Sequence, residues 1–191
     1  MNILYVNSHP QAKGSFHEAI EKAFVDHISP EHEVKVLRLG DATFDPILRH
    51  GYAKRMKPDS YIEESQELVT WADHIVFAFP VWWGDAPALM KGWIDRVFTP
   101  GVTYHVEGIK IHKLLRGTSA DIIVTQRGLR PLAWVFGNHH IGIFTHNLFA
   151  LCGIKKRRII TIGGIGLTSQ FDTPKRRAHF LERVARAASS L

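Results

Sequence analysis

The 191-residue sequence has one cysteine and no apolar run of about 18 residues, the length that would cross a membrane. A lone thiol cannot form an internal disulfide, and the apolar setting LFALCGI predicts that Cys152 is buried and structural. The first residues, MNILYVNSHP, lack the basic start and long apolar centre of a signal peptide. These absences lead us to expect a cytoplasmic protein.

Two common phosphate-binding motifs are also missing. Neither GxxxxGK[ST] nor GxGxxG occurs, which argues against a P-loop nucleotidase and against a dinucleotide-binding Rossmann domain. The formal charge of +6 suits an anionic partner. The basic residues are scattered, however, apart from short clusters at 155–158 and 175–177, and no zinc-finger or RNA-binding signature is present. We therefore expect solvated helix ends and faces here, no nucleic-acid partner and no bound metal.

Apolar segments alternate with amphipathic ones along the whole chain. Strands are predicted at Asn2–Val6, Glu33–Leu39, His74–Phe79, Ala120–Thr125 and Arg158–Ile162. Helices are predicted at Ser15–Ile28, Ile62–Ala72, Pro87–Val97, His139–Cys152 and from Thr173 to about Ala188. This alternation predicts one α/β domain over residues 1–191, with a five-stranded parallel sheet and helices on both faces.

Local signals refine the helix ends and the loops. Ser60 and Glu63 have the spacing of a capping box at the start of the second helix. Gly153 is placed to end the fourth helix. The stretches 40–59 and 98–118 carry no clear periodicity, so we expect them to be irregular. Long loops in a compact domain are usually functional or take part in association.

The turn after the first strand has the character of a phosphate cradle. Small and polar residues lead into a helix N-terminus, where free backbone N–H groups and the helix dipole favour an anion. Ser15 offers a hydroxyl and an amide, Phe16 an amide and His9 a ring nitrogen. Two other interpretations stay open: serine is a common N-cap without any ligand, and a loop histidine can bond to the backbone.

The stretch FAFPVWWGDAP, residues 77–87, places two adjacent tryptophans after the third predicted strand. In open parallel sheets, ligands bind beyond the carboxyl ends of the strands. A planar aromatic cofactor would pack well against the indole of Trp82 or Trp83. The alternative interpretation is that both indoles cap the hydrophobic core. A phosphate cradle after strand 1 and an aromatic shelf after strand 3 together describe the two ends of flavin mononucleotide (FMN).

Three stretches carry a resemblance to a known family: SHP at 8–10 with SF at 15–16, the block ADHIVFAFPVWWGDAPALMKGWIDRVF at 72–98, and LCGI at 151–154. On these the sequence resembles the NAD(P)H:quinone oxidoreductases of the flavodoxin-like fold, the family of DT-diaphorase, modulator of drug activity B and the ancillary reductases of potassium-efflux systems. The resemblance implies sheet order 2-1-3-4-5 and a flavin site completed by a second subunit. It also implies ping-pong transfer of hydride from NAD(P)H to quinones.

The resemblance assigns site residues by position. His9, Ser15 and Phe16 match the phosphate-binding turn. The isoalloxazine loop corresponds to Pro80, Val81, Trp82, Trp83 and Gly84. Thr125, Gln126, Arg127 and Gly128 stand where the family commonly has a Thr-Thr-Gly-Gly run. Trp83 and Tyr104 are expected beside the reacting groups, and His139 or His140, with Trp134, are the nearest candidates for the family's tyrosine and histidine near the flavin.

Three further expectations complete this account. FMN is favoured over FAD because no adenine site is evident in the sequence. A homodimer is expected because aromatic and apolar residues are unusually abundant near the site; these are Trp93, Phe98, Val102, Tyr104, Trp134, Phe136 and Phe144. Trp93, at helical spacing with Ile94 and Val97, is expected in the core, and the rest exceed what the core needs to bury. Arg127 either supplies a cation to the flavin edge, covers the pocket mouth, or lies in solvent or beside a carboxylate such as Asp85. The alternative functions are an electron-carrier flavodoxin, which would usually be acidic, and a flavin-binding regulatory subunit of a membrane transporter.

Overall fold

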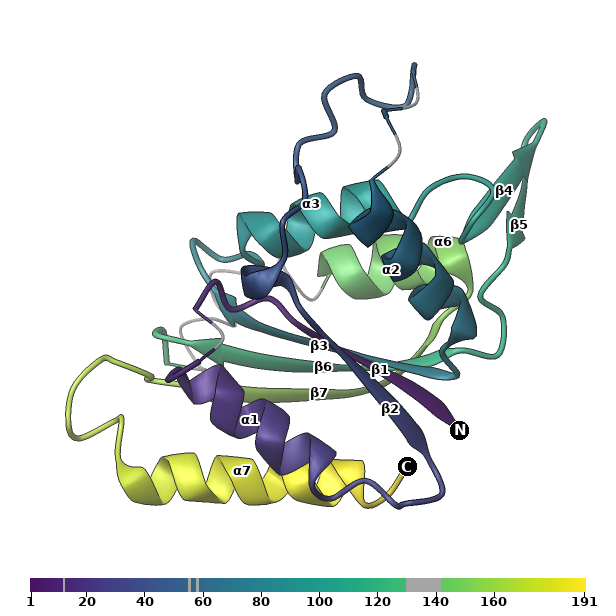
Figure 1. Ribbon diagram of the computed structural model, residues 1–191. Coiled ribbons are helices and arrows are strands. Elements are labelled where there is room, and N and C mark those ends of the chain that lie inside the picture. Colours follow the sequence, from purple (N-terminus) through teal and green to yellow (C-terminus); the bar gives the residue numbers. More distant parts are fainter. Residues whose placement is uncertain (12, 55, 58, 130–141) are drawn as a thin grey trace.

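The computed structural model describes residues 1–11, 13–54, 56–57, 59–129 and 142–191. At its centre lies a parallel sheet of five strands in the order β2-β1-β3-β6-β7 (Figure 1). The strands are β1 (Asn2–Asn7), β2 (Glu33–Arg38), β3 (His74–Val81), β6 (Ser119–Gln126) and β7 (Lys155–Gly163). Counted along the parallel strands alone, this is the predicted order 2-1-3-4-5, which is confirmed.

Helices cover both faces of the sheet, as predicted (Figure 1). On one face lie α1 (Phe16–Val25) and α7 (Pro174–Ala188), side by side. On the other lie α2 (Ser60–Trp71), α3 (Ala88–Val97) and the short α6 (Ala150–Cys152), which follows a π-helical segment, Ile143–Phe149. A single 3₁₀ turn, Leu39–Asp41, follows β2. The predicted helix start at His139 lies outside the described residues.

The sheet separates two hydrophobic cores. Ile3 and Tyr5 of β1 pack with the α1 and α7 side, while Leu4 and Val6 pack with the α2 and α3 side. Successive side chains of a strand point to opposite faces, so β1 serves both cores. β3 is buried along nearly its whole length, which explains why its sequence is a continuous apolar run rather than an alternating one.

Several helix ends are fixed by side-chain caps. The predicted capping box at the start of α2 is wrong: Asp59, not Ser60, is the N-cap, and its carboxylate accepts from the amides of Tyr61 and Ile62. Aspartate is as strong an N-cap as serine and lies one residue earlier, so the helix begins at Ser60. Gly153 ends α6 with φ of 91°, in the left-handed conformation predicted for a C-terminal glycine.

The stretch 98–118 is not wholly irregular, contrary to prediction. It contains an antiparallel hairpin of β4 (Tyr104–Glu107) and β5 (Lys110–Lys113), which projects from the body of the molecule (Figure 1). The hairpin carries an exposed apolar set: Val106, Ile109, Ile111 and, just beyond it, Leu114.

By contrast Phe98 and Phe144, predicted at a subunit interface, are buried in the core of this chain, as is Trp93.

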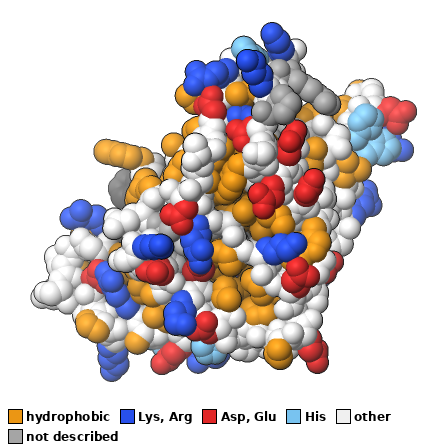
Figure 2. All heavy atoms as spheres, in the orientation of Figure 1, with side chains coloured by type: hydrophobic (Ala, Val, Ile, Leu, Met, Phe, Trp, Pro, Cys, Tyr) orange, Lys and Arg blue, Asp and Glu red, His pale blue; other side chains and the backbone are white. Residues whose placement is uncertain are grey.

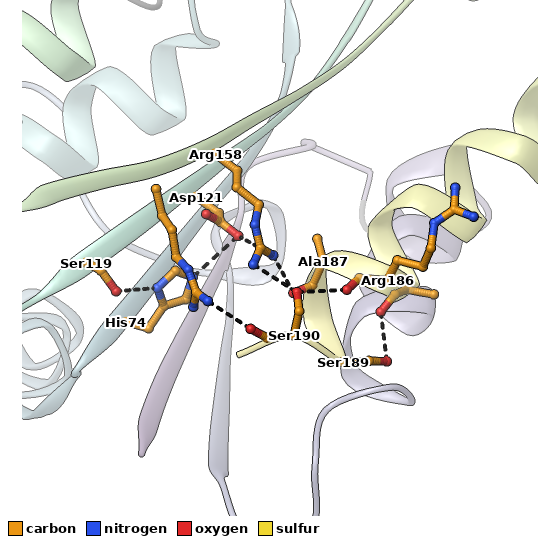
Figure 3. A network of polar contacts seen from close by, with 10 residues as sticks. His74, Ser119, Asp121, Arg158, Arg186, Ala187, Ser189 and Ser190 are labelled. Carbon is orange, nitrogen blue, oxygen red and sulfur yellow. Dashed lines mark hydrogen bonds and ion pairs between the residues drawn. The ribbon is translucent and has the colours of Figure 1, made fainter.

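A buried polar network joins the amino-terminal ends of the inner strands to the end of α7 (Figure 3). The Asp121 carboxylate lies 3.7 Å from His74 Nε2 and 3.7 Å from Arg158 Nη1, and both Asp121 and His74 are fully buried. His74 Nδ1 lies 2.7 Å from Ser119 Oγ. Arg158 also donates to the carbonyl of Ala187 and to Ser190 Oγ. The network therefore ties the chain's last helix to the sheet.

The surface in Figure 2 carries lysine and arginine interspersed with aspartate and glutamate, rather than one continuous basic area on that face. Cys152 is buried, as predicted. Among the helices in the described part of the chain, none is long and apolar enough to cross a membrane.

Candidate functional site

A cavity of about 350 Å³ opens at the carboxyl ends of β1, β3 and β6. It lies where the strand order reverses between β1 and β3, the usual ligand position in such sheets. Its lining comes from several loops and from the ends of the strands and helices that they join, and consists of His9, Gln11, Ser15, Phe16, His17, Pro80, Trp82, Thr125, Gln126, Ile165 and Arg177. The structure thus brings together the predicted phosphate turn, the tryptophan loop and the end of the fourth parallel strand.

Ser15 is both the N-cap of α1 and a wall of this cavity. Its side chain accepts from the amide of Glu18 at 3.4 Å, so the capping interpretation holds, and capping does not prevent contact with a ligand. The amides of Phe16 and His17 belong to the first turn, where the helix supplies no acceptor. Gly14 precedes them with φ of 76°, a conformation that suits glycine. The turn therefore presents donors to an anion.

His9 is held by its own loop, which is linked through Asn7 to a partly buried ion pair between Glu21 and Arg38. Its amide donates to Asn7 Oδ1 at 3.1 Å, and Asn7 Nδ2 donates to Glu21 Oε2 at 3.0 Å. Arg38 in turn donates to the Glu21 carboxylate. His9 Nδ1 lies 2.7 Å from the carbonyl oxygen of Gln11, which is the backbone contact left open above. The ring also lines the cavity.

His17 was not predicted as a site residue, although its position in the first turn of α1 points it towards the sheet. It is 2% exposed, and its Nε2 lies 2.9 Å from Thr125 Oγ1, which links α1 to β6. Burial, together with a smaller effect of the neighbouring ring of His9, lowers the pKa of His17 to about 3. His17 is therefore neutral at pH 7. Its Nδ1 has no hydrogen-bond partner within the described residues.

The two tryptophans lie on a tight two-residue turn. Trp82 and Asp85 exchange backbone hydrogen bonds of 2.9 and 3.0 Å, with Trp83 and Gly84 between them at φ of 52° and 81°. Two positive φ values make this a type I′ hairpin turn, which favours asparagine and glycine. Within the described chain, Trp83 is the one non-glycine residue with positive φ. A bulky residue in that conformation is strained.

Neither indole caps the core of this chain, which was the second interpretation of the stretch. Trp82 is 47% exposed and Trp83 106% exposed. Trp82 and Pro80 line the cavity. Val81, Trp83 and Gly84 belong to the same turn but lie outside the cavity lining. The structure therefore divides the predicted isoalloxazine loop into a wall, Pro80 and Trp82, and an exposed tip, Trp83.

The predicted site residues at the end of β6 also fall into two groups, one that lines the cavity and one that is exposed outside it. Thr125 and Gln126 are buried and line the cavity. Arg127 and Gly128 follow them, are exposed, and lie outside the lining. Gln126 Nε2 donates to the carbonyl of Gly128 at 3.2 Å, which shapes the turn. Arg127 forms no ion pair with Asp85 or with any other described residue.

Two other predicted residues are placed as follows. Tyr104 begins β4, is half-buried, and packs against the core cluster beside α2 and α3 rather than against the cavity. Burial is the main cause that raises the pKa of its phenol. His139 and His140 lie outside the described residues, as do Trp134 and Phe136.

Arg177 is a second lining residue that sequence reasoning missed. It lies in the first turn of α7, and its guanidinium donates to both oxygens of Asp172, at 2.6 and 2.7 Å. The guanidinium carbon lies 4.8 Å from the centre of the Phe16 ring. The hydrogen bonds from Arg177 are the main cause that lowers the pKa of Asp172 to about 2. Its basic cluster, 175–177, had been assigned to a solvated helix end.

These residues fit a phosphorylated cofactor with a planar ring. The first-turn amides suit a phosphate, the Trp82 indole offers a flat apolar surface, and His17, whose buried Nδ1 has no partner among the described residues, belongs to the same lining. A larger cavity, about 420 Å³, lies between the 48–57 loop, α2 and the end of α3, and no predicted site residue lines it. In the described residues no group of three histidine, cysteine or acidic side chains could hold a metal.

Comparisons with known proteins agree with this geometry. A family profile described as having the flavodoxin-like fold matches residues 1–187. An NAD(P)H oxidoreductase of Haemophilus influenzae is 30% identical over 178 residues, 87% of this chain and 86% of that protein. Ribosyldihydronicotinamide dehydrogenase [quinone] of Mus musculus is 27% identical over 179 residues, 80% and 77% of the two chains.

Solved structures show the same fold. The crystal structure of Smu.1420 from Streptococcus mutans has a TM-score of 0.87 at 30% identity, with both chains fully covered. An FMN-dependent NADH-azoreductase from Bacillus anthracis, solved in complex with FMN, has a TM-score of 0.76 at 16% identity, covering 100% of this chain and 99% of the other.

Proposed function

Because the chain belongs to the family with the flavodoxin-like fold, we propose that it is a flavin-dependent NAD(P)H oxidoreductase that reduces quinones or similar acceptors by two electrons. One observation carries the proposal. The anion-binding turn at Ser15 and the indole of Trp82, far apart in the sequence, line one cavity at the carboxyl edge of the sheet. Relatives named as NAD(P)H oxidoreductase and quinone dehydrogenases support the same reaction.

FMN is the proposed form of the flavin. The described lining supplies a single anion-binding turn, and we find no aromatic slot there for an adenine. The bound flavin would supply the hydride chemistry. Around it, Ser15 and Phe16 would hold the phosphate, Trp82 and Pro80 would pack beside the ring, and Thr125 and Gln126 would hydrogen-bond its polar edge.

The exposed tip of the loop is proposed to act on the second substrate. NAD(P)H and the quinone would occupy the same position in turn, as ping-pong transfer requires, and the Trp83 indole would cover whichever of them is bound. Arg127, exposed beside this position, is proposed to approach the flavin edge where negative charge develops on reduction.

A homodimer is part of the proposal. The exposed apolar side chains of the hairpin, Val106, Ile109 and Ile111, form the kind of patch that usually marks an interface. Tyr104 stands at the base of the same hairpin. In a dimer formed through this patch, Tyr104 of one subunit would approach the flavin site of the other. Light scattering at micromolar concentration tests this, and a fully active monomer would refute it. A cytoplasmic location is also proposed, in keeping with the single buried thiol, Cys152.

Steady-state oxidation of NADH and of NADPH, with menadione as acceptor, tests the reaction. The flavin-loaded protein should consume reduced nicotinamide in proportion to enzyme, and parallel lines in a double-reciprocal plot should report ping-pong order. Protein stripped of flavin is the control and should be inactive. A flavin-loaded protein that oxidises neither nucleotide would refute the enzyme and leave an electron carrier.

A further inference from the structure

Cations from two distant parts of the chain meet at the amino-terminal edge of the sheet, and we propose that this basic surface binds an anionic lipid bilayer. The basic surface consists of Lys113, Leu114, Arg116, Lys155, Lys156 and Arg157, all of which are exposed. The inference goes beyond the proposed function and does not depend on it, because the cavity proposed for the flavin lies at the carboxyl edge of the sheet.

The end of the hairpin and the start of β7 pack against each other at Gly153. A β-carbon at this position would lie 2.9 Å from Lys113 Cβ and 3.2 Å from Arg116 Cγ, closer than ordinary contacts, so the approach requires glycine. Beyond it, the amide of Lys155 donates to the carbonyl of Thr118 at 2.9 Å. The basic residues that follow the hairpin and those that begin β7 therefore form one surface.

The backbone beneath this surface is held in place by hydrogen bonds to the body of the molecule. The amide of Leu114 donates to the carbonyl of Thr103 at 3.1 Å, and the amide of Leu115 donates to the carbonyl of Cys152 at 3.0 Å. Arg157 Nη2 donates to the carbonyl of Ser190 at 2.8 Å. A surface fixed in this way loses little conformational entropy when it binds a partner.

The charges of the basic surface are not neutralised within the chain. Among the described residues, none of its five cations forms an ion pair. Lys22 and Lys91, by contrast, each pair with an aspartate four residues later. Two carboxylates flank the surface: Asp73 precedes β3, and Glu107 lies on the hairpin. Five cations against two carboxylates leave a net positive charge.

The composition of the surface favours a lipid bilayer over a nucleic acid. Anionic lipids attract each lysine or arginine close to the membrane, and the attraction falls off within a Debye length. Leu114, 47% exposed among the cations, would be buried at the boundary between headgroups and acyl chains. The basic surface includes no aromatic ring that could stack on a base. The residues proposed for the dimer, Val106, Ile109 and Ile111, lie nearer the hairpin tip and remain available.

The test is co-sedimentation of the purified protein with vesicles of phosphatidylcholine alone or mixed with phosphatidylserine. Wild type should bind only the mixed vesicles, and more weakly as salt rises. Lys155→Gln with Lys156→Gln should weaken binding by roughly thirtyfold, from about fivefold for each cation. The matched control, Lys91→Gln with Lys175→Gln, removes the same charge near the starts of α3 and α7, at the opposite edge, and should change binding by less than about twofold.

The leucine and a second pair of cations sharpen the test. Leu114→Gln should keep the preference for mixed vesicles and weaken binding by roughly fivefold, as the loss of half of a buried leucine side chain predicts. Lys113→Gln with Arg116→Gln repeats the comparison if the first double variant does not fold.

Three results would overturn the inference while the proposed function stands. These are no binding by wild type, equal binding to both kinds of vesicle, and equal losses in the surface and control variants, which would report net charge rather than this surface. Retention of duplex DNA in a gel shift, without binding to mixed vesicles, would assign the surface to nucleic acid and would also overturn it.

Discussion

The two edges of the sheet use their polar residues in opposite ways. At the amino-terminal edge, Asp121, His74 and Arg158 pair with one another and with the end of α7 (Figure 3). At the carboxyl-terminal edge, Ser15 and Trp82 line an open cavity. The same sheet therefore has one closed edge that holds the fold together and one open edge that is available to a ligand.

The last helix, α7, contacts the polar network at the amino-terminal edge of the sheet and also lines the cavity at the carboxyl-terminal edge. The carbonyl of Ala187 and the hydroxyl of Ser190, at its end, accept hydrogen bonds from Arg158. Arg177, in its first turn, lines the cavity at the opposite edge. Substitutions near the two ends of one helix should thus separate stability from binding.

Arg158→Ala should destabilise the protein by about 3 kcal/mol, because it leaves the fully buried Asp121 carboxylate without its permanent cation. FMN affinity should stay within about twofold of wild type, because the network lies at the far edge. Urea denaturation and flavin titration measure the two quantities. Arg157→Ala, the exposed neighbour, is the matched control and should change stability by less than about 0.5 kcal/mol. Weakened FMN binding with unchanged stability in Arg158→Ala would contradict the division of roles.

His9→Ala and Ser15→Ala should produce the opposite pattern. Each should weaken FMN binding by about tenfold to hundredfold, since each would remove a proposed hydrogen bond to the charged phosphate, worth roughly 1.5–3 kcal/mol. Ser15→Ala also removes the N-cap of α1 and should cost about 1 kcal/mol of stability. Asp59→Ala removes the N-cap of α2 on the other face and controls for that loss. If both cradle variants retain wild-type affinity, these side chains serve only the loop and the cap.

Trp83→Asn should stabilise the protein by about 1 kcal/mol, because asparagine tolerates the left-handed conformation that Trp83 adopts at φ of 52°. The same change should raise the KM for menadione, since it removes the indole that is proposed to cover the acceptor. Thermal unfolding and steady-state kinetics test the two halves together. A stabilised variant with unchanged kinetics would show that the strain at Trp83 has no part in substrate binding.

The pairing of Asp172 with Arg177 should make stability depend on pH in acid. The pKa of Asp172 is lowered to about 2 in the folded protein, so its contribution is complete above the ordinary aspartate pKa near 4 and disappears as pH falls through about 2. Because the Arg177 side chain is 40% exposed, we expect only about 1 kcal/mol. The free energy of unfolding of wild type should exceed that of Asp172→Asn by that amount at pH 6, and the difference should vanish near pH 2. A constant difference across this range would contradict the assignment.

The sheet and most helices could be predicted because periodicity and apolar runs are local properties. The continuous apolar run in β3 and the alternation of apolar with amphipathic segments along the chain needed no tertiary information. The hairpin at 104–113 was missed because its sequence, with Lys110 and His112 among its strand residues, is too polar for a buried strand. Asp59 was missed as a cap because the Ser60 and Glu63 pair matched a longer motif.

The site was predicted in part for a related reason. The turn at 8–17 and the tryptophan loop each follow a strand, so the rule for open sheets places them at one edge. His17 and Arg177 could not be found in this way. Their approach to the cavity depends on α1 and α7 lying side by side on one face of the sheet (Figure 1), with the first turn of each helix at the same edge. That is a property of packing rather than of a motif.

The central claim is that the open edge holds a flavin. The most direct test is the visible absorption spectrum of the purified protein, followed by the mass of the cofactor released on denaturation. The account predicts a yellow protein that releases one FMN per chain, or a flavin-free protein that binds added FMN with a saturable quench of its fluorescence. A colourless protein with no affinity for FMN or FAD would contradict it.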